Sequence, residues 1–166
     1  MRAVGLAAVI VAALAQAAPA QEVPFGESHD ASQPVEITSD RLDLDQAAGT
    51  AVFTGGVRVG QGALRLAADR VEVFYDEGGS ASGTVRSMHA TGNVTLSNGE
   101  EAAEAERATY DVATGLVEME GDVLLTQGQN ALSSERLTID LNQGTGRLDG
   151  RVKTIFVPGT TPQTAP

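Results

Sequence analysis

Two short sequence landmarks alternate along the chain at nearly constant spacing, and this repetition limits the fold to a stack of similar units. The first landmark is a triplet of a small residue, an acid and an arginine, found four times: Ser39-Asp40-Arg41, Ala68-Asp69-Arg70, Ala105-Glu106-Arg107 and Ser134-Glu135-Arg136. The second is a Gly-x-Val that follows each triplet: Gly55-Gly56-Val57, Gly92-Asn93-Val94, Gly121-Asp122-Val123 and Gly150-Arg151-Val152. From arginine to glycine the distance is 14 residues in three units and 22 in the second. The spacing predicts four repeats of about 29 residues.

The second repeat carries eight extra residues. They fall around residues 76–84, in a glycine- and serine-rich stretch that is typical of a surface loop. The remaining repeats contain no comparable insertion.

Around each Gly-x-Val, apolar side chains occupy every second position, as in Ala51, Phe53, Val57 and Val59. This period of two is typical of a β-strand with one buried face. The landmark glycine lies on the inward face, where it leaves room and permits a bend. Only residues 100–110 resemble a helix, and their place in the repeat favours a strand. The sequence therefore predicts an all-β domain.

Each triplet separates two runs of apolar residues that have opposite parity. Before the second triplet, Leu64 and Leu66 occupy even-numbered positions. After it, Val71 and Val73 occupy odd-numbered positions. A straight strand cannot keep both runs on one face. A β-bulge or a corner between two sheets would restore the inward direction. We expect the acid and the arginine to stay outside, the acid of one repeat near the arginine of the next, in exposed pairs worth about 0–1 kcal/mol.

The two ends of the chain differ from the repeats. Residues 1–20 contain Arg2, an apolar run of 13 residues and a small-x-small signal ending at Ala20, which together predict a secretory signal peptide. The run is shorter than the roughly 20 residues of a membrane-spanning helix; cleavage after Ala17 is the alternative to Ala20. We expect a flexible leader at 21–33, the ordered domain at 34–157 and a disordered tail at 158–166.

Composition excludes several classes of function. The chain has no cysteine and two histidines, and the loss of Arg2 with the signal peptide changes the net charge from −11 to −12. So acidic a chain is not expected to bind nucleic acid. Acids near turns lack the ligand spacing of a calcium loop, and no nucleophile with a base partner is present. We therefore expect no enzyme activity, no metal site and no cofactor.

The inward face is aliphatic and leaves two interiors open. The two faces of the fold would meet in a closed core, or they would stay apart as a groove. Alternation alone is compatible with both, although a closed core is the more common arrangement.

The residues resemble a known family. The stretches "PVEITSDRLDLD", "GTAVFTGGVRVGQGALRLAADRVEVFY", "ATGNVTL", "VEMEGDVLLTQGQNALSSERLTIDL" and "RVKTIFVPG" are similar to the OstA-like domain family of lipopolysaccharide-transport proteins. The resemblance covers about residues 34–159 and implies an antiparallel β-jellyroll of two twisted sheets, V-shaped in section, with open edges at both ends. It also implies a periplasmic protein that binds lipopolysaccharide by its lipid A acyl chains in a hydrophobic groove.

The same resemblance implies partners. The protomers would join head to tail through edge strands near residues 35–40 and 152–157, in a bridge between the inner-membrane and outer-membrane components of the transport machinery. On this reading the inward side chains contact lipid, and we expect these contacts at Ile37, Leu44, Phe53, Val57, Leu66, Val73, Val94, Leu96, Met119, Val123, Leu125, Ile139 and Leu148. Two other classes fit the repeats as well: a structural β-solenoid that forms filaments without ligand, and a general periplasmic lipid carrier.

Overall fold

The structure is a computed structural model, and it describes residues 21–25, 30, 32–76 and 83–158. The predicted signal peptide, most of the insertion at 76–84 and the tail beyond residue 158 lie outside these residues. The described part is all-β and contains no helix, as the sequence predicted. Its strands are β1 (Gln21–Pro24), β2 (Glu36–Thr38), β3 (Arg41–Asp45), β4 (Thr50–Gln61), β5 (Leu64–Tyr75), β6 (Val85–Asn98), β7 (Glu101–Asp111), β8 (Leu116–Gln127), β9 (Asn130–Asp140), β10 (Thr145–Asp149) and β11 (Lys153–Ile155). The stretch with helical character, residues 100–110, falls almost entirely in β7.

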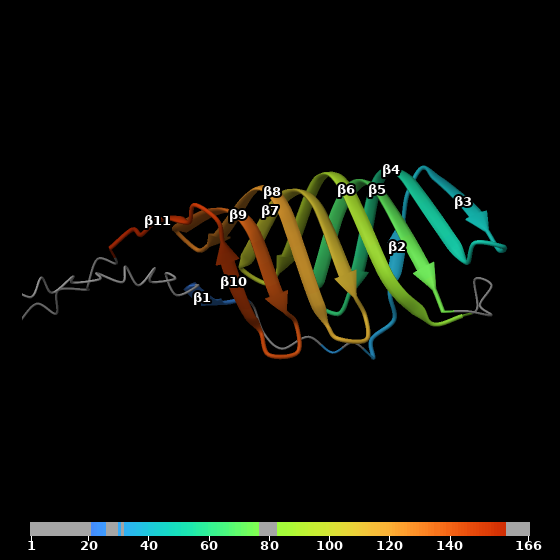
Figure 1. Cartoon of the computed structure of the whole chain (residues 1–166), viewed down its shortest axis with the longest axis horizontal. Helices are drawn as coiled ribbons and strands as arrows, with labels where there is room; N and C mark the ends of the chain where they lie inside the picture. The colour runs from blue at the N-terminus through green and yellow to red at the C-terminus, as the bar shows by residue number, and fades with distance from the viewer. Residues whose placement is uncertain (1–20, 26–29, 31, 77–82, 159–166) are drawn as a thin grey trace, which may run out of the picture.

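The strands form one antiparallel sheet in which β4 to β10 lie side by side in sequence order, while the other strands are added at the two ends. The order is β1-β10-β9-β8-β7-β6-β5-β4-β2, with β3 also paired to β4 and β11 also paired to β9. The sheet does not close: β2 and β3 lie at one end, and β1, β10 and β11 lie at the other (Figure 1). This agrees with the jellyroll expected from the resemblance.

The six long strands, β4 to β9, bend near their middles. Every pairing among them has a register shift at the level of the landmarks, for example between Thr91 and Val94 where β6 meets β7. In Figure 1 the strands arch over along one long side of the molecule, and most of the drawn turns lie along the other. We call these the bend side and the open side. The change of parity predicted at the triplets is therefore confirmed as a row of β-bulges.

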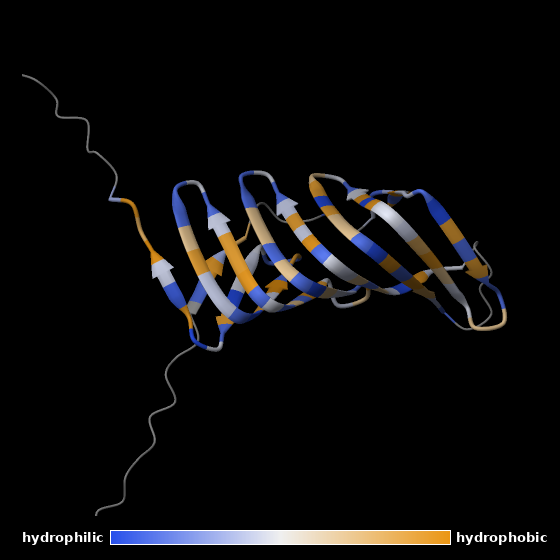
Figure 2. Ribbon diagram, turned by 90° about the horizontal axis from the view of Figure 1, so that it is seen from above, coloured by the Kyte–Doolittle hydropathy of each residue, from blue (hydrophilic) through white to orange (hydrophobic). Residues whose placement is uncertain are grey.

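The bend divides the sheet into two layers. The first layer contains β2, β11 and residues 57–61, 64–68, 94–98, 101–105, 123–127 and 130–134. The second layer contains β1, β3, β10 and residues 50–54, 70–75, 85–91, 107–111, 116–120 and 136–140. Figure 2 shows hydrophobic and hydrophilic residues alternating along the long strands, as a sheet with one buried face requires.

The landmark glycine and the triplet acid form one structural device. Gly121 has a φ of 86° and Asp122 one of 44°, so two successive residues adopt the left-handed conformation that bends the strand. A Cβ on Gly121 would lie 2.6 Å from Oε2 and 2.8 Å from Cβ of Glu106, on the neighbouring strand. The acid of the triplet thus packs over the glycine that follows it, and a larger residue has no room.

The charged pairs differ from the expected arrangement. Triplet acids contact the middle residue of the Gly-x-Val that follows: Asn93 Nδ2 donates to Asp69 over 2.8 Å, and Arg151 Nε donates to Glu135 over 2.7 Å. Triplet arginines contact other acids, as Arg136 contacts Glu120. The predicted pairing of triplet acid with the next triplet arginine is therefore wrong. The acid lies at the bulge beside the next strand's glycine, whereas the arginine lies beyond the bulge, level with acids of the second layer.

The leader prediction also needs correction. Residues 21–24 form β1, which pairs with β10 with Val23 opposite Gly146. Four residues are too few to show a period of two, and the partner strand is at the far end of the sequence. The expected edges at 35–40 and 152–157 do contain β2 and β11, which lie at opposite ends of the first layer.

Candidate functional site

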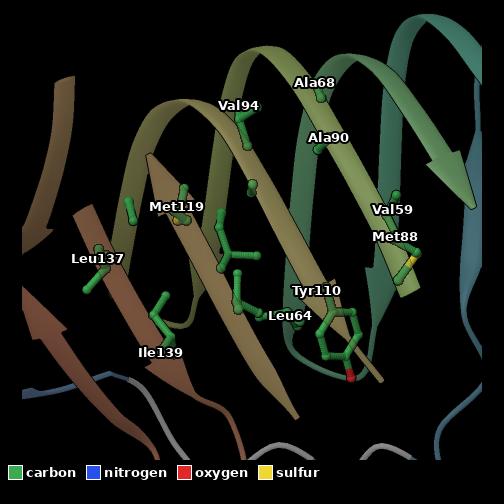
Figure 3. Close-up of a cluster of buried hydrophobic side chains, with 14 of the residues drawn as sticks. Val59, Leu64, Ala68, Met88, Ala90, Val94, Tyr110, Met119, Leu137 and Ile139 are labelled. Atoms are coloured by element: carbon green, nitrogen blue, oxygen red, sulfur yellow. The ribbon is translucent and has the colours of Figure 1, made fainter. Parts of the chain in front are cut away.

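The space between the two layers is filled by small and aliphatic side chains. In the described chain 24 hydrophobic residues are buried there in one continuous cluster, and Tyr110 and Phe25 are its aromatic members. Figure 3 shows Val94, Met119 and Leu137 directed from the arching strands into this space. The cluster extends from β4 to β10, along nearly the whole sheet.

Twelve of the 13 predicted lipid-contact positions lie in or against this cluster. Nine are fully buried: Val57, Val73, Val94, Leu96, Met119, Val123, Leu125, Ile139 and Leu148. Ile37, Phe53 and Leu66 are half-buried and pack against the others. Leu44 lies apart, 56% exposed on the free edge of β3. Parity was enough to find the inward set because each strand keeps its alternation on either side of the bulge.

The interior is closed in this structure. Between the layers lies a cavity of about 30 Å³, lined by Gln61 and by apolar residues of β4 to β8 that include Val59, Leu64 and Met88. Such a volume is enough for about one water molecule. An acyl chain would therefore enter only if the layers moved apart. The bend side is fixed by bulges, so the open side is where this movement would occur.

Tyr110 was not among the predicted lipid-contact positions. It lies two residues after the buried Ala108, so the period of two would have placed it on the inward face. Its side chain lines the cavity and is 5% exposed. Among the described residues its hydroxyl is buried without a hydrogen-bond partner, and burial raises the pKa of the phenol. In Figure 3 the hydroxyl points away from the arch, toward the open side. An unpaired donor there is available to a polar group of a ligand.

The outer faces carry pairs of opposite charge. Glu120 accepts hydrogen bonds from Arg136 and Arg107, and these bonds lower the pKa of its carboxyl group. The hydrogen bond from Arg41 likewise lowers the pKa of the Asp43 carboxyl group. Within the described residues no group of three or more histidines and acids is placed to hold a metal ion.

Both ends of the sheet expose apolar side chains. At one end lie Leu42 and Leu44 of β3, and at the other lie Ile155 and Phe156, in and just after β11. Phe156 is 66% exposed. Large apolar side chains beside unpaired strand edges are typical of surfaces that join another chain.

Comparison with known proteins identifies the family to which this architecture belongs. Residues 36–145 match the model of a family described as LptA/(LptD N-terminal domain) LPS transport protein.

The chain belongs to this family.

An uncharacterised protein of Rhizobium meliloti is 35% identical over 106 residues, which cover 61% of this chain and 56% of that protein. The lipopolysaccharide export system protein LptA of Escherichia coli K12 is 39% identical over 61 residues, or 36% of this chain and 33% of LptA. The chain thus spans about half the length of the first relative and a third of the second.

A solved structure confirms the fold. LptH of Pseudomonas aeruginosa, described as the LptA homologous periplasmic component of the lipopolysaccharide transport device, aligns with a TM-score of 0.69 and 20% identity. The alignment covers 78% of this chain and 99% of LptH. The family is one of lipopolysaccharide-transport proteins, a role that is not enzymatic. Among the residues described here, no helix is long and apolar enough to span a membrane.

Proposed function

We propose that this protein carries lipopolysaccharide through the periplasm with the acyl chains of lipid A held between its two layers. The observation that supports this most directly is the aliphatic interior, which extends along nearly the whole of a sheet with a free strand edge at each end. A closed barrel would also bury such side chains, but it would have neither free strand edges for a second copy nor an opening along its side for the sugar head.

The energetics favour such a path. Each buried methylene contributes about 0.8 kcal/mol, so several acyl chains exposed to water would cost tens of kcal/mol. Between the layers a chain would exchange one aliphatic contact for another as it slides, with little change in buried area. The side chains need only exclude water, and no covalent step or cofactor is involved. Directed movement then requires energy from another component, which we assign to the inner-membrane machinery.

The phosphorylated sugar head would remain in solvent. After signal cleavage the chain carries a net charge of −12. Its outer acids, such as Glu118 and Glu120, would repel phosphate groups rather than bind them. The open side allows the head to stay outside while the acyl chains lie between the layers.

We also propose a head-to-tail bridge that links inner-membrane and outer-membrane components of the transport machinery. β2 and β3 end the sheet at one side, and β11 ends the first layer at the other. Such edges extend readily by pairing with another strand. A second copy added in this way would continue both the sheet and its aliphatic interior.

A photo-crosslinking residue at Leu125 tests lipid binding in cells. Leu125 is fully buried between the layers, whereas its neighbour Leu124 points outward and is 38% exposed. We expect a lipopolysaccharide adduct at Leu125 and at Phe53, and none at Leu124, which is the matched control. Adducts with phospholipid alone would favour a general lipid carrier. The absence of an adduct at every inward position would favour a structural solenoid and overturn the proposal.

A further inference from the structure

β1 occupies the free side of β10, at the end of the second layer. Four residue pairs join the two strands, from Gln21 opposite Leu148 to Pro24 opposite Thr145. Val23 packs closely there, since a Cβ on Gly146 would lie 3.4 Å from its Cγ2. Glu22 forms an ion pair with Arg147 over 3.8 Å. The N-terminal strand is therefore fitted to this edge by both shape and charge.

Phe25, the residue after β1, closes the interior at the same end. Its side chain is 0% exposed and belongs to the buried cluster. Its N–H donates to the carbonyl oxygen of Gly144, in the β9–β10 turn of the second layer, over 2.8 Å. The side chain of Gln127, at the end of β8 in the first layer, donates to the carbonyl oxygen of Pro24. Residues 24–25 thus tie the two layers together across the open side.

This arrangement makes the end of the sheet asymmetric. The first layer ends in β11, whose outer edge is unpaired in the described chain, whereas the second layer ends in a strand supplied from the N-terminus. A second copy that continued both layers would need the edge of β10 that β1 covers. It would also meet Phe25 where the two interiors should join.

The register of β8 and β9 indicates how β3 of a second copy would pair with the edge of β10. Inside the chain, Glu120 lies opposite Arg136 and Met119 opposite Leu137 where β8 meets β9. The repeat spacing of 29 places Asp149 and Leu148 at the positions of Glu120 and Met119.

The same register across a junction would set Asp149 against Arg41 of the second copy, and Leu148 against its Leu42. Arg147 would face Asp43, much as it now faces Glu22. Leu42 and Leu44 of β3 are 47% and 56% exposed in the single chain, and both would become buried. Each outward pair would then be of opposite charge.

We infer that residues 21–25 form an internal stopper that competes with β3 of a second copy for the edge of β10. A single protomer is closed at this end by its own N-terminal strand and Phe25. Joining to the next protomer displaces the strand, withdraws Phe25 and connects the two interiors. This inference rests on the proposed head-to-tail bridge, and it adds that the interior opens only where protomers are joined.

A disulfide that can be made and broken tests the stopper. The protein has no cysteine, so Val23→Cys with Gly146→Cys introduces the only thiols, at positions that face each other. We expect the oxidised variant, which cannot release β1, to remain monomeric by light scattering at concentrations at least tenfold above those at which the reduced variant associates. The cysteine-free parent, with and without reductant, is the control. Equal association in the two redox states would overturn the inference.

A crosslinking experiment separates this inference from the proposed function, and a charge reversal tests which strand displaces β1. With the Leu125 crosslinker added to the disulfide variant, we expect the lipopolysaccharide adduct only after reduction. Adducts of equal yield in both states would overturn the stopper and leave lipid binding intact. If neither state gives an adduct, the proposed lipid site fails, while light scattering still decides the stopper. Asp149→Arg should weaken association at least tenfold, and adding Arg41→Asp should restore it if β3 is the displacing strand.

Discussion

Replacement of Gly121 by alanine tests the device that bends the sheet. The φ of 86° at this position disfavours any residue with a Cβ, at a cost of about 1–2 kcal/mol. The new Cβ would also lie 2.8 Å from Cβ of Glu106, which rotation of that side chain cannot move away. The strands must therefore shift, and overpacking of this kind costs about 1–3 kcal/mol. We expect Gly121→Ala to lower the free energy of unfolding by about 2–5 kcal/mol.

Gly128 is the matched control. Its φ of 57° is also left-handed, but a Cβ there would meet no atom within 4 Å. Gly128→Ala should therefore show the conformational cost alone, about 1–2 kcal/mol. Urea unfolding followed by circular dichroism measures both variants, provided the slope with denaturant stays unchanged.

The comparison has a clear failing result. If Gly121→Ala and Gly128→Ala lower the free energy of unfolding equally, the close packing of Glu106 over Gly121 adds nothing to the cost of a Cβ there. That result would refute the reasoning. A second check is Gly121→Ala combined with Glu106→Gly, which removes the obstructing Cβ. In a double-mutant cycle, Gly121→Ala should lower the free energy of unfolding by less in the Glu106→Gly background than in the parent.

Three other substitutions test the interior and the outer pairs. Leu125→Ala should lower the free energy of unfolding by about 2–5 kcal/mol, while Leu124→Ala, on the exposed face, should change it by less than about 0.5 kcal/mol in urea unfolding. Tyr110→Phe removes a buried hydroxyl that has no partner among the described residues, so it should raise the free energy of unfolding by about 1 kcal/mol and weaken lipopolysaccharide binding in a titration. The hydrogen bonds from Arg136 and Arg107 lower the pKa of Glu120 in the folded state. Its contribution to the free energy of unfolding is therefore present above the pKa of an unfolded glutamate and is lost as pH falls through the folded pKa. Glu120→Gln should therefore lose less stability than the parent on acidification, and identical acid unfolding curves would contradict the role of Arg136 and Arg107.

Sequence reasoning found the strands and the inward positions because both follow from local periodicity. The alternation around Val94 and Val123 required a buried face, and the opposite parity on either side of Ala68 required a bulge. Neither inference needs knowledge of what lies across the sheet. The prediction failed for the charged triplets, where the contacts depend on register between strands rather than on spacing within one.

The N-terminal strand β1 follows from topology and not from local periodicity. Four residues that include a proline give no periodic signal, and Val23 packs against Gly146 only because the topology brings the two ends of the domain together. Leu44 was placed with the inward set by its parity, but it lies on an edge strand with no neighbour to cover it.

The sequence by itself determined the all-β character, the bend in every repeat and the aliphatic lining, because these depend on residues within a few positions of one another. Only the tertiary structure decided how tightly the two layers close, which acid packs on which glycine, and what covers the edge of β10. Those features depend on contacts between distant segments, whose free energy is set by shape and register that no single stretch of sequence contains.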